Sequence, residues 1–268
     1  MVQIFLHPPD IDDTVEEVAR SSVTTAGLRG FSSLSLRLKN GARVGFQLEV
    51  PDFGVIDDGL GEISWHNTVT GVQFLVSAPE RCKPGPRHAT LRIFVEGVPA
   101  GRIHFLVSVE KKASHDQPEP RGDLAGNYQK AFISYASEDR MEVLKRVQTL
   151  SALRIDFFQD LLDLEPGERW QKALYLHIDQ SDLFLLFWSS RARGSVWVGK
   201  EIAYALERQR LNRDGEPDIV PVIIEGPPPP PPPKELAHLH FNDRLIYFMR
   251  GSGAADLGEC QNPEADLK

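Results

Sequence analysis

The sequence of 268 residues has only two cysteines, Cys82 and Cys260, and they lie in different regions of the chain. Such a pair builds neither a disulfide framework nor a zinc site, so we expect a reducing compartment, most simply the cytoplasm. The chain also has no apolar run long enough to span a bilayer. Its apolar start, MVQIFLH, is followed at once by PPDIDD, without the basic leader and cleavage site of a signal peptide. We therefore expect no membrane partner.

The chain has fewer basic than acidic residues, with 30 Lys and Arg against 38 Asp and Glu and a net charge of −8. A nucleic-acid-binding surface normally needs a basic patch, so we expect no nucleic-acid partner. The sequence also lacks a glycine-rich phosphate-binding loop, which excludes Rossmann-type dinucleotide binding. Its histidines are scattered without metal-ligand spacing, so we expect no metal site.

The first 110 residues contain short segments in which apolar and polar residues alternate. This period of two is typical of half-buried strands, and EGVPAG between the last two segments fits a hairpin connection. One stretch near the start, residues 10–22, instead predicts a helix with Asp12 or Asp13 as its N-cap. The sequence therefore predicts an all-β sandwich over residues 1–110. Because no reactive constellation occurs in it, we expect an interaction or sensor domain with an unknown signal or protein partner. The predicted strands cover residues 33–39, 43–50, 72–76, 91–95 and 102–109.

Three further segments lack the periodicity of helices and strands. Residues 111–127 are rich in Pro, Gly and charge, which predicts a linker. The run from Pro227 to Pro233 predicts an extended polyproline II segment, either a stiff spacer or a docking motif. The tail, residues 251–268, has the composition of a disordered segment.

After Tyr128 apolar strands alternate with helices, a pattern typical of a parallel sheet covered on both faces. We predict five parallel strands, with helices between them and Ser137 as the N-cap of the first helix. Ligands of such sheets bind at the carboxyl ends of the strands, so this edge is the expected site. The predicted strands cover residues 130–136, 155–160, 182–189, 218–224 and 245–248, and the helices 137–150, 166–178 and 195–207.

The last of these helices, SVWVGKEIAYALE, has an apolar face formed by residues 198, 202, 205 and 206. Trp197, Glu201 and Tyr204 form a second stripe beside it. Glu201 is therefore either a solvated helix charge, the commoner case for Glu, or a carboxylate held in a pocket for chemistry.

Four motifs in their order along the chain, FISYASEDR, FFQD…LEPGERW, SDLFLLFWS and SVWVGKEI, resemble a bacterial-type Toll/interleukin-1 receptor (TIR) domain. The resemblance covers residues 128–250 and implies a flavodoxin-like α/β fold. It does not extend to the N-terminal half.

Many TIR domains of this kind cleave NAD⁺ at the nicotinamide–ribose bond, so the resemblance implies an NAD⁺ hydrolase or cyclase with NAD⁺ as substrate and no cofactor. The family's W-x-x-x-E pattern matches Trp197 to Glu201, which makes Glu201 the expected catalytic residue. The expected substrate-binding residues are Ser134, Tyr135, Asp160, Trp170 and Trp197, with residues 160–170 corresponding to the mobile BB loop. Family members are activated by self-association, and bacterial antiphage defence is the natural context.

Structural roles compete with each of these assignments. Trp197 and Trp170 also suit packing roles, Asp160 suits a loop hydrogen bond, and Ser134 has no nearby His to activate it. The alternatives to an enzyme are a non-catalytic TIR–TIR adaptor or scaffold and a bacterial effector acting on host signalling, and the W-x-x-x-E match favours the enzyme over a pure scaffold.

Overall fold

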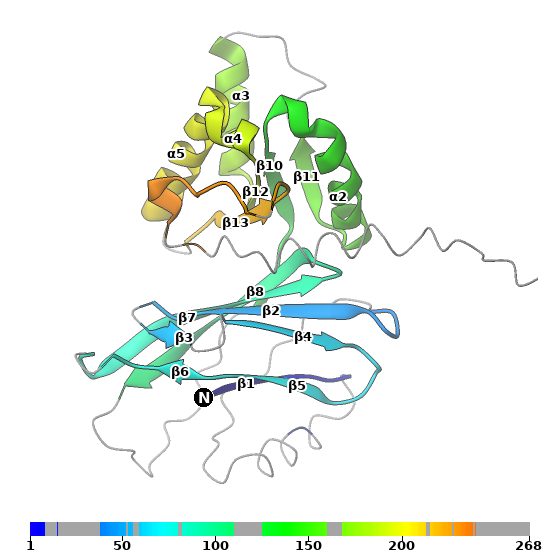
Figure 1. Ribbon diagram of the computed structural model, residues 1–268, viewed down its shortest axis with the longest axis vertical. Helices are drawn as coiled ribbons and strands as arrows, with labels where there is room; N and C mark the ends of the chain where they lie inside the picture. Colours follow the sequence, from blue (N-terminus) through cyan, green and yellow to red (C-terminus); the bar gives the residue numbers. More distant parts are fainter. Residues whose placement is uncertain are drawn as a thin grey trace, which may run out of the picture.

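The computed structural model describes residues 1–8, 15, 38–51, 53–55, 59–79, 82–109, 125–159, 168–212, 215–226, 228–237 and 239. The N-terminal region is rich in strands, as predicted, and its largest sheet has five antiparallel strands in the order β4-β2-β7-β8-β9. Two smaller antiparallel sheets pair β1 with β5 and β3 with β6 (Figure 1). The strands are β1 (Val2–Leu6), β2 (Arg43–Glu49), β3 (Gly54–Val55), β4 (Leu60–Ser64), β5 (Thr70–Phe74), β6 (Val76–Ser77), β7 (Gly85–Val95), β8 (Val98–Val109) and β9 (Ala125–Asn127).

The longest pairing in this sheet is the β7–β8 hairpin, which confirms the predicted connection. Its turn has two central residues, Glu96 and Gly97, and both have positive φ, +50° and +77°. Val95 and Val98 pair on either side of them. Positive φ at both central residues is the requirement of a type I′ turn, whose twist matches that of the strands.

The N-terminal sheets share one hydrophobic core. Phe46, Leu48 and Leu91 point into it from the five-stranded sheet, and Phe74 and Ile4 from the β1–β5 pair. The alternation of the sequence thus identified the inward face of β2, β5 and β7 correctly. The predicted strand at residues 33–39 falls mainly outside the described residues, as does the predicted helix at 10–22.

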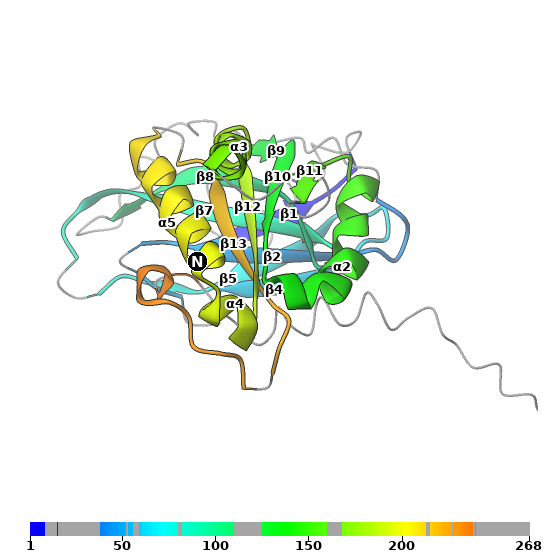
Figure 2. The ribbon, with the colours of Figure 1, turned by 90° about the horizontal axis from the view of Figure 1, so that it is seen from above.

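The C-terminal region is a parallel sheet of four described strands in the order β11-β10-β12-β13. One face packs on α2, and the other packs on α3, α4 and α5 (Figures 1 and 2). The predicted fifth strand, residues 245–248, lies outside the described residues. The elements are β10 (Lys130–Ser134), η1 (Ser137–Asp139), α2 (Arg140–Ala152), β11 (Asp156–Gln159), α3 (Glu168–Asp179), β12 (Leu183–Trp188), α4 (Ser190–Gly194), α5 (Val196–Leu211), β13 (Asp218–Ile223) and η2 (Lys234–Leu236).

One capping prediction is wrong. Ser137 begins the 3₁₀ turn η1, and its hydroxyl donates to the Glu138 carboxylate at 3.0 Å and does not cap α2. The N-cap of α2 is Asp139. The chain makes one tight turn after β10 before the α-helix begins, which moves the cap by two residues.

The end of the predicted linker is ordered. Residues 125–127 form β9, which pairs antiparallel with β8 through Arg102↔Gly126 and its neighbours. The chain therefore passes from the edge of the N-terminal sheet into β10 within a few residues.

Within the described part of the chain, no helix combines the length and apolar character needed to cross a membrane.

Candidate active site

The helix α5 places a carboxylate inside the protein. Ser195 caps the helix by accepting from the Val198 backbone N–H at 3.3 Å. Val198 and Ile202 are buried against the sheet, as the sequence pattern predicted. Glu201 lies between them in sequence and is only 5% exposed. A buried Glu is uncommon unless it has a partner, so its surroundings decide what it can do.

That partner is Ser134, the last residue of β10. Its hydroxyl donates to Glu201 Oε2 at 2.5 Å, and Ser134 itself is 1% exposed. An O–H···O⁻ bond of this length is typical of a charge-assisted hydrogen bond. A serine hydroxyl has one hydrogen to donate, so this donation is committed to Glu201. The two residues therefore form a fixed pair at the carboxyl end of a central strand, where such sheets bind ligands.

A second buried carboxylate, Asp139, lies at the same edge of the sheet, and sequence reasoning missed it. The Ser189 hydroxyl donates to Asp139 Oδ2 at 2.5 Å, and Arg191 binds Asp139 Oδ1 at 2.7 Å. Ser189 also caps α4 by accepting from the Ala192 N–H at 3.0 Å. This cluster ties the segment after β10 to the segment after β12. Its one signal in the sequence is a serine directly after an apolar strand.

The proline run packs against the carboxyl end of β12. The indole N–H of Trp188 donates to the backbone oxygen of Pro230 at 3.0 Å in a buried contact. Further along, Leu236 is fully buried against the core that contains α5. The chain is thus held against the rest of the protein at Pro230 and again at Leu236.

A surface carboxylate holds the start of α4. Glu225, two residues past β13, accepts from the Ser190 backbone N–H at 2.5 Å and from the Ser190 hydroxyl at 2.8 Å. These bonds, first the backbone one, lower the pKa of Glu225. The ends of β12 and β13 are therefore joined by side chains as well as by the sheet.

Trp197 stands beside the site without being part of the core. Its side chain is 42% exposed, and Lys200 Nζ lies 4.4 Å from its ring centroid, a cation–π contact. Of the two roles that the sequence left open, a core anchor does not fit this exposure. A half-exposed indole one turn before a buried carboxylate can instead form the wall of a binding site.

Of the remaining predicted residues, the structure describes the side chain of Tyr135 alone, and it lies apart from Glu201. Tyr135 is buried in the core on the α2 face, whereas Ser134 faces α5, because successive residues of a strand point to opposite faces. Trp170 lies in the first turn of α3, as predicted, but its side chain is outside the described structure. Asp160 also falls outside the described residues.

The described ranges contain no group of three or more His, Cys, Asp and Glu side chains placed to hold a metal ion.

Comparison with known proteins agrees with this architecture. Residues 131–251 match the model of the TIR domain family. A search of the curated proteins found no match to the chain. The matched segment contains the parallel sheet, α2 to α5, and the Ser134–Glu201 pair. The C-terminal half of this chain therefore carries a TIR domain.

Proposed function

We propose that this protein is an NAD⁺ hydrolase or cyclase that cleaves the nicotinamide–ribose bond, with Glu201 as the catalytic carboxylate. The observation that carries the proposal is the Ser134–Glu201 pair. It is a buried carboxylate, oriented by a 2.5 Å hydrogen bond, at the carboxyl edge of the parallel sheet of a TIR domain. A carboxylate that served only as a surface charge would not be held in this way.

Cleavage of the nicotinamide–ribose bond needs few catalytic groups beyond a buried carboxylate. When the C1′–N bond breaks, its electron pair goes to the pyridinium nitrogen and nicotinamide leaves neutral, so no general acid is needed. The ribose becomes oxocarbenium-like, and a negative carboxylate beside it offsets the developing positive charge. In hydrolysis a water oxygen then bonds to C1′ and releases a proton, which gives ADP-ribose. In cyclisation a nucleophilic atom of the same ADP-ribosyl group takes the place of water.

The other expected residues fit around this centre. Trp197 offers an exposed aromatic face one turn before Glu201, suited to stacking on the nicotinamide ring. Asp160 and Trp170, at the two ends of the predicted BB loop, remain proposed substrate contacts. Tyr135 is the weakest of the set, because it is buried on the other face of the sheet.

Activation by self-association is part of the proposal, since the TIR resemblance implies that one domain's BB loop completes a neighbour's site. NAD⁺ cleavage should then rise more steeply than linearly with protein concentration. The proposed setting is bacterial antiphage defence, in which assembly depletes NAD⁺ in the cell.

The test compares two substitutions on one helix. Glu201→Gln keeps the size of the side chain and removes its charge, and nicotinamide release should fall to background. Glu207→Gln is the matched control, because Glu207 lies on α5 but is exposed and paired with Arg210 at 2.8 Å. It should retain wild-type turnover. In cells, overexpression should lower NAD⁺ and arrest growth, and Glu201→Ala should relieve both effects.

The alternative function is a non-catalytic TIR–TIR adaptor. One observation favours it: Val196 is 72% exposed next to the half-exposed Trp197, which gives α5 an apolar end suited to contact with another protein. An adaptor would assemble without releasing nicotinamide. In that case Val196→Asp would abolish assembly, and Glu201→Gln would change nothing.

A further inference from the structure

The second half of the strand β7, residues 91–95, is buried on both faces. Leu91 and Ile93 point into the N-terminal core, as the alternation predicts. Arg92 and Phe94 point the other way, yet they are only 7% and 4% exposed. What covers them is the TIR domain, which stands on the β7–β8 hairpin in Figure 1.

The two regions share a hydrophobic core at this contact. Phe94 and Val98 from the hairpin belong to the same buried cluster as Ala131, Val220 and Val222 from the parallel sheet. Among the described residues, α2 is the one helix that contributes to this face of the parallel sheet. The β7–β8 hairpin therefore helps α2 to cover this face of the parallel sheet, whereas α3, α4 and α5 pack on the opposite face.

A buried ionic cluster lies beside this core. Two nitrogens of Arg92 bind the two carboxylate oxygens of Asp218, each at 2.8 Å, and the third binds Glu49 at 2.7 Å. Tyr128 donates its hydroxyl to Asp218 Oδ2 at 2.5 Å. Asp218 is the first residue of β13, so the N-terminal region binds the amino end of an edge strand of the described sheet.

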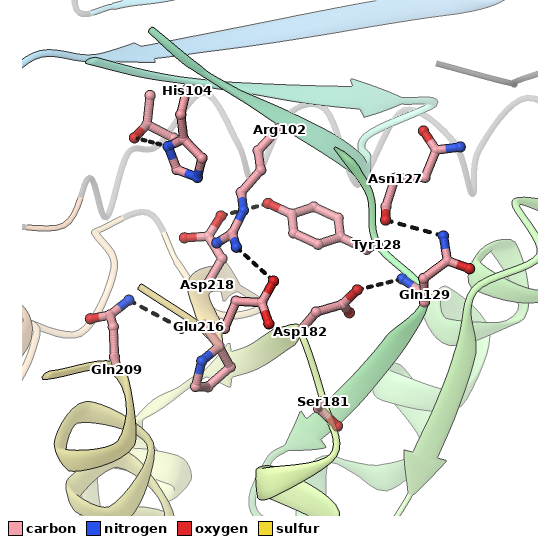
Figure 3. Close-up of polar contacts among 12 residues, drawn as sticks. Arg102, His104, Asn127, Tyr128, Gln129, Ser181, Asp182, Gln209, Glu216 and Asp218 are labelled. Carbon is pink, nitrogen blue, oxygen red and sulfur yellow. Dashed lines mark hydrogen bonds and ion pairs between the residues drawn. The ribbon is translucent and has the colours of Figure 1, made fainter. Parts of the chain in front are cut away.

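A second ion pair flanks the cluster. Arg102 of β8 binds Glu216 at 3.0 Å, and its guanidinium carbon lies 6.0 Å from the centroid of the Tyr128 ring. Figure 3 shows Arg102, Tyr128, Asp218 and Glu216 converging from both regions. Charges buried to this degree are costly unless paired, so separating the two regions would leave Asp218 and Arg92 uncompensated.

From this interface we infer that the N-terminal sheet is a structural part of the TIR domain and that the two regions fold, unfold and move as one unit. Domains joined by a linker move relative to each other by default unless their interface is large and apolar or otherwise fixed. Here the shared core and the Arg92–Asp218 bidentate pair fix it. A signal received by the N-terminal sheet would therefore reach the TIR domain as a movement of the whole rigid unit.

The strand β13 connects the Arg92–Asp218 contact to the carboxyl end of the parallel sheet. Asp218 begins β13, and Glu225, just past its end, holds Ser190 at the start of α4. The helix α5 with Glu201 follows directly.

The first measurement uses the unmodified full-length chain. Calorimetry should show a single unfolding transition that includes both regions. Hydrogen exchange should give the amides of β7 and of β12–β13 the same free energy of opening, because cooperative units exchange together. Two separate transitions, with the two strand sets exchanging independently, would overturn the inference.

The second measurement is a double-mutant cycle with Arg92→Met and Asp218→Leu. Each single substitution should lower Tm by roughly 10 °C, because it leaves one buried charge unpaired. Each should also speed exchange in both regions. The double variant leaves neither Arg92 nor Asp218 as an unpaired charge, so it should lose less than the sum of the two single losses.

Arg43→Met is the matched control, because Arg43 pairs with Glu96 at 3.3 Å inside the N-terminal region, with both side chains partly exposed. It should shift Tm by no more than a few degrees. If Asp218→Leu raises exchange only in the TIR domain, and Arg92→Met only in the N-terminal region, the two regions are not one unit. Additive effects in the cycle would refute the inference equally.

Discussion

Removing the Ser134 hydroxyl is the most informative change near the proposed catalytic carboxylate. Ser134→Ala deletes the hydrogen bond of 2.5 Å to Glu201 Oε2 and leaves the backbone of β10 unchanged. A hydrogen bond to a charged group is worth about 1.5–3 kcal/mol. If the bond orients the carboxylate in the transition state, kcat should fall by roughly 10- to 100-fold, since each 1.36 kcal/mol is about tenfold. KM for NAD⁺ should change little, because Ser134 holds Glu201 and its one hydrogen is not offered to substrate.

The control for this experiment is another buried serine. Ser181 is 1% exposed, as Ser134 is, and its hydroxyl donates to the His177 carbonyl at 2.8 Å. It lies just before β12, at the opposite edge of the sheet from Glu201. Ser181→Ala should lower the free energy of unfolding by about 1 kcal/mol but leave kcat unchanged. Ser134→Ala should lower the free energy of unfolding by at least as much, and it should lower kcat as well. Steady-state nicotinamide release measures kcat, and thermal unfolding measures the change in stability. Equal kcat for Ser134→Ala and wild type would refute the orienting role of the hydroxyl.

Three further predictions concern stability. Burial alone would raise the pKa of Asp218, but the charge of Arg92 lowers it to about 2. Because this pKa lies below that of an unfolded Asp, near 3.8, the stabilisation is complete above pH 4 and is lost as pH falls toward 2. The full stabilisation amounts to roughly 2 kcal/mol. Between pH 6 and pH 2.5 the free energy of urea unfolding of the full chain should therefore fall by about 1.5 kcal/mol more than that of Asp218→Asn does. Leu236→Ala should cost about 2–5 kcal/mol in urea unfolding, since the side chain is fully buried, and a loss below 1 kcal/mol would show that this segment is not docked. Trp188→Phe keeps an aromatic ring but removes the indole bond to Pro230, so it should cost about 1 kcal/mol, whereas a neutral effect would mean that the bond contributes nothing.

The sequence was most informative where one physical rule decides the structure. Period-two alternation identified the inward faces of β2 and β7, and turn chemistry identified the β7–β8 hairpin. Apolar strands alternating with helices predicted a parallel sheet with helices on both faces, and four of its strands are described. The spacing of Val198 and Ile202 predicted the buried face of α5.

Contacts between distant segments could not be predicted in the same way. Alternation placed Arg92 on the outer, polar face of β7, and only the fold shows that Asp218, 126 residues later, covers it. The burial of Glu201 has the same origin, because its partner Ser134 lies 67 residues earlier. Local pattern also missed Asp139, whose partners Ser189 and Arg191 come from the end of another strand. In each case the partner of the buried charge follows from the tertiary structure, not from local spacing.

The proposed function depends most on the role of Glu201 as the catalytic carboxylate. The most direct test is nicotinamide release from NAD⁺ by purified protein at high concentration or with a crowding agent, with Glu201→Gln and Glu207→Gln compared side by side. We expect the wild type and Glu207→Gln to release nicotinamide at equal rates, and folded Glu201→Gln to release none above background. Undiminished NAD⁺ consumption by a folded Glu201→Gln variant would contradict the claim, as would a wild-type protein that assembles and yet never releases nicotinamide.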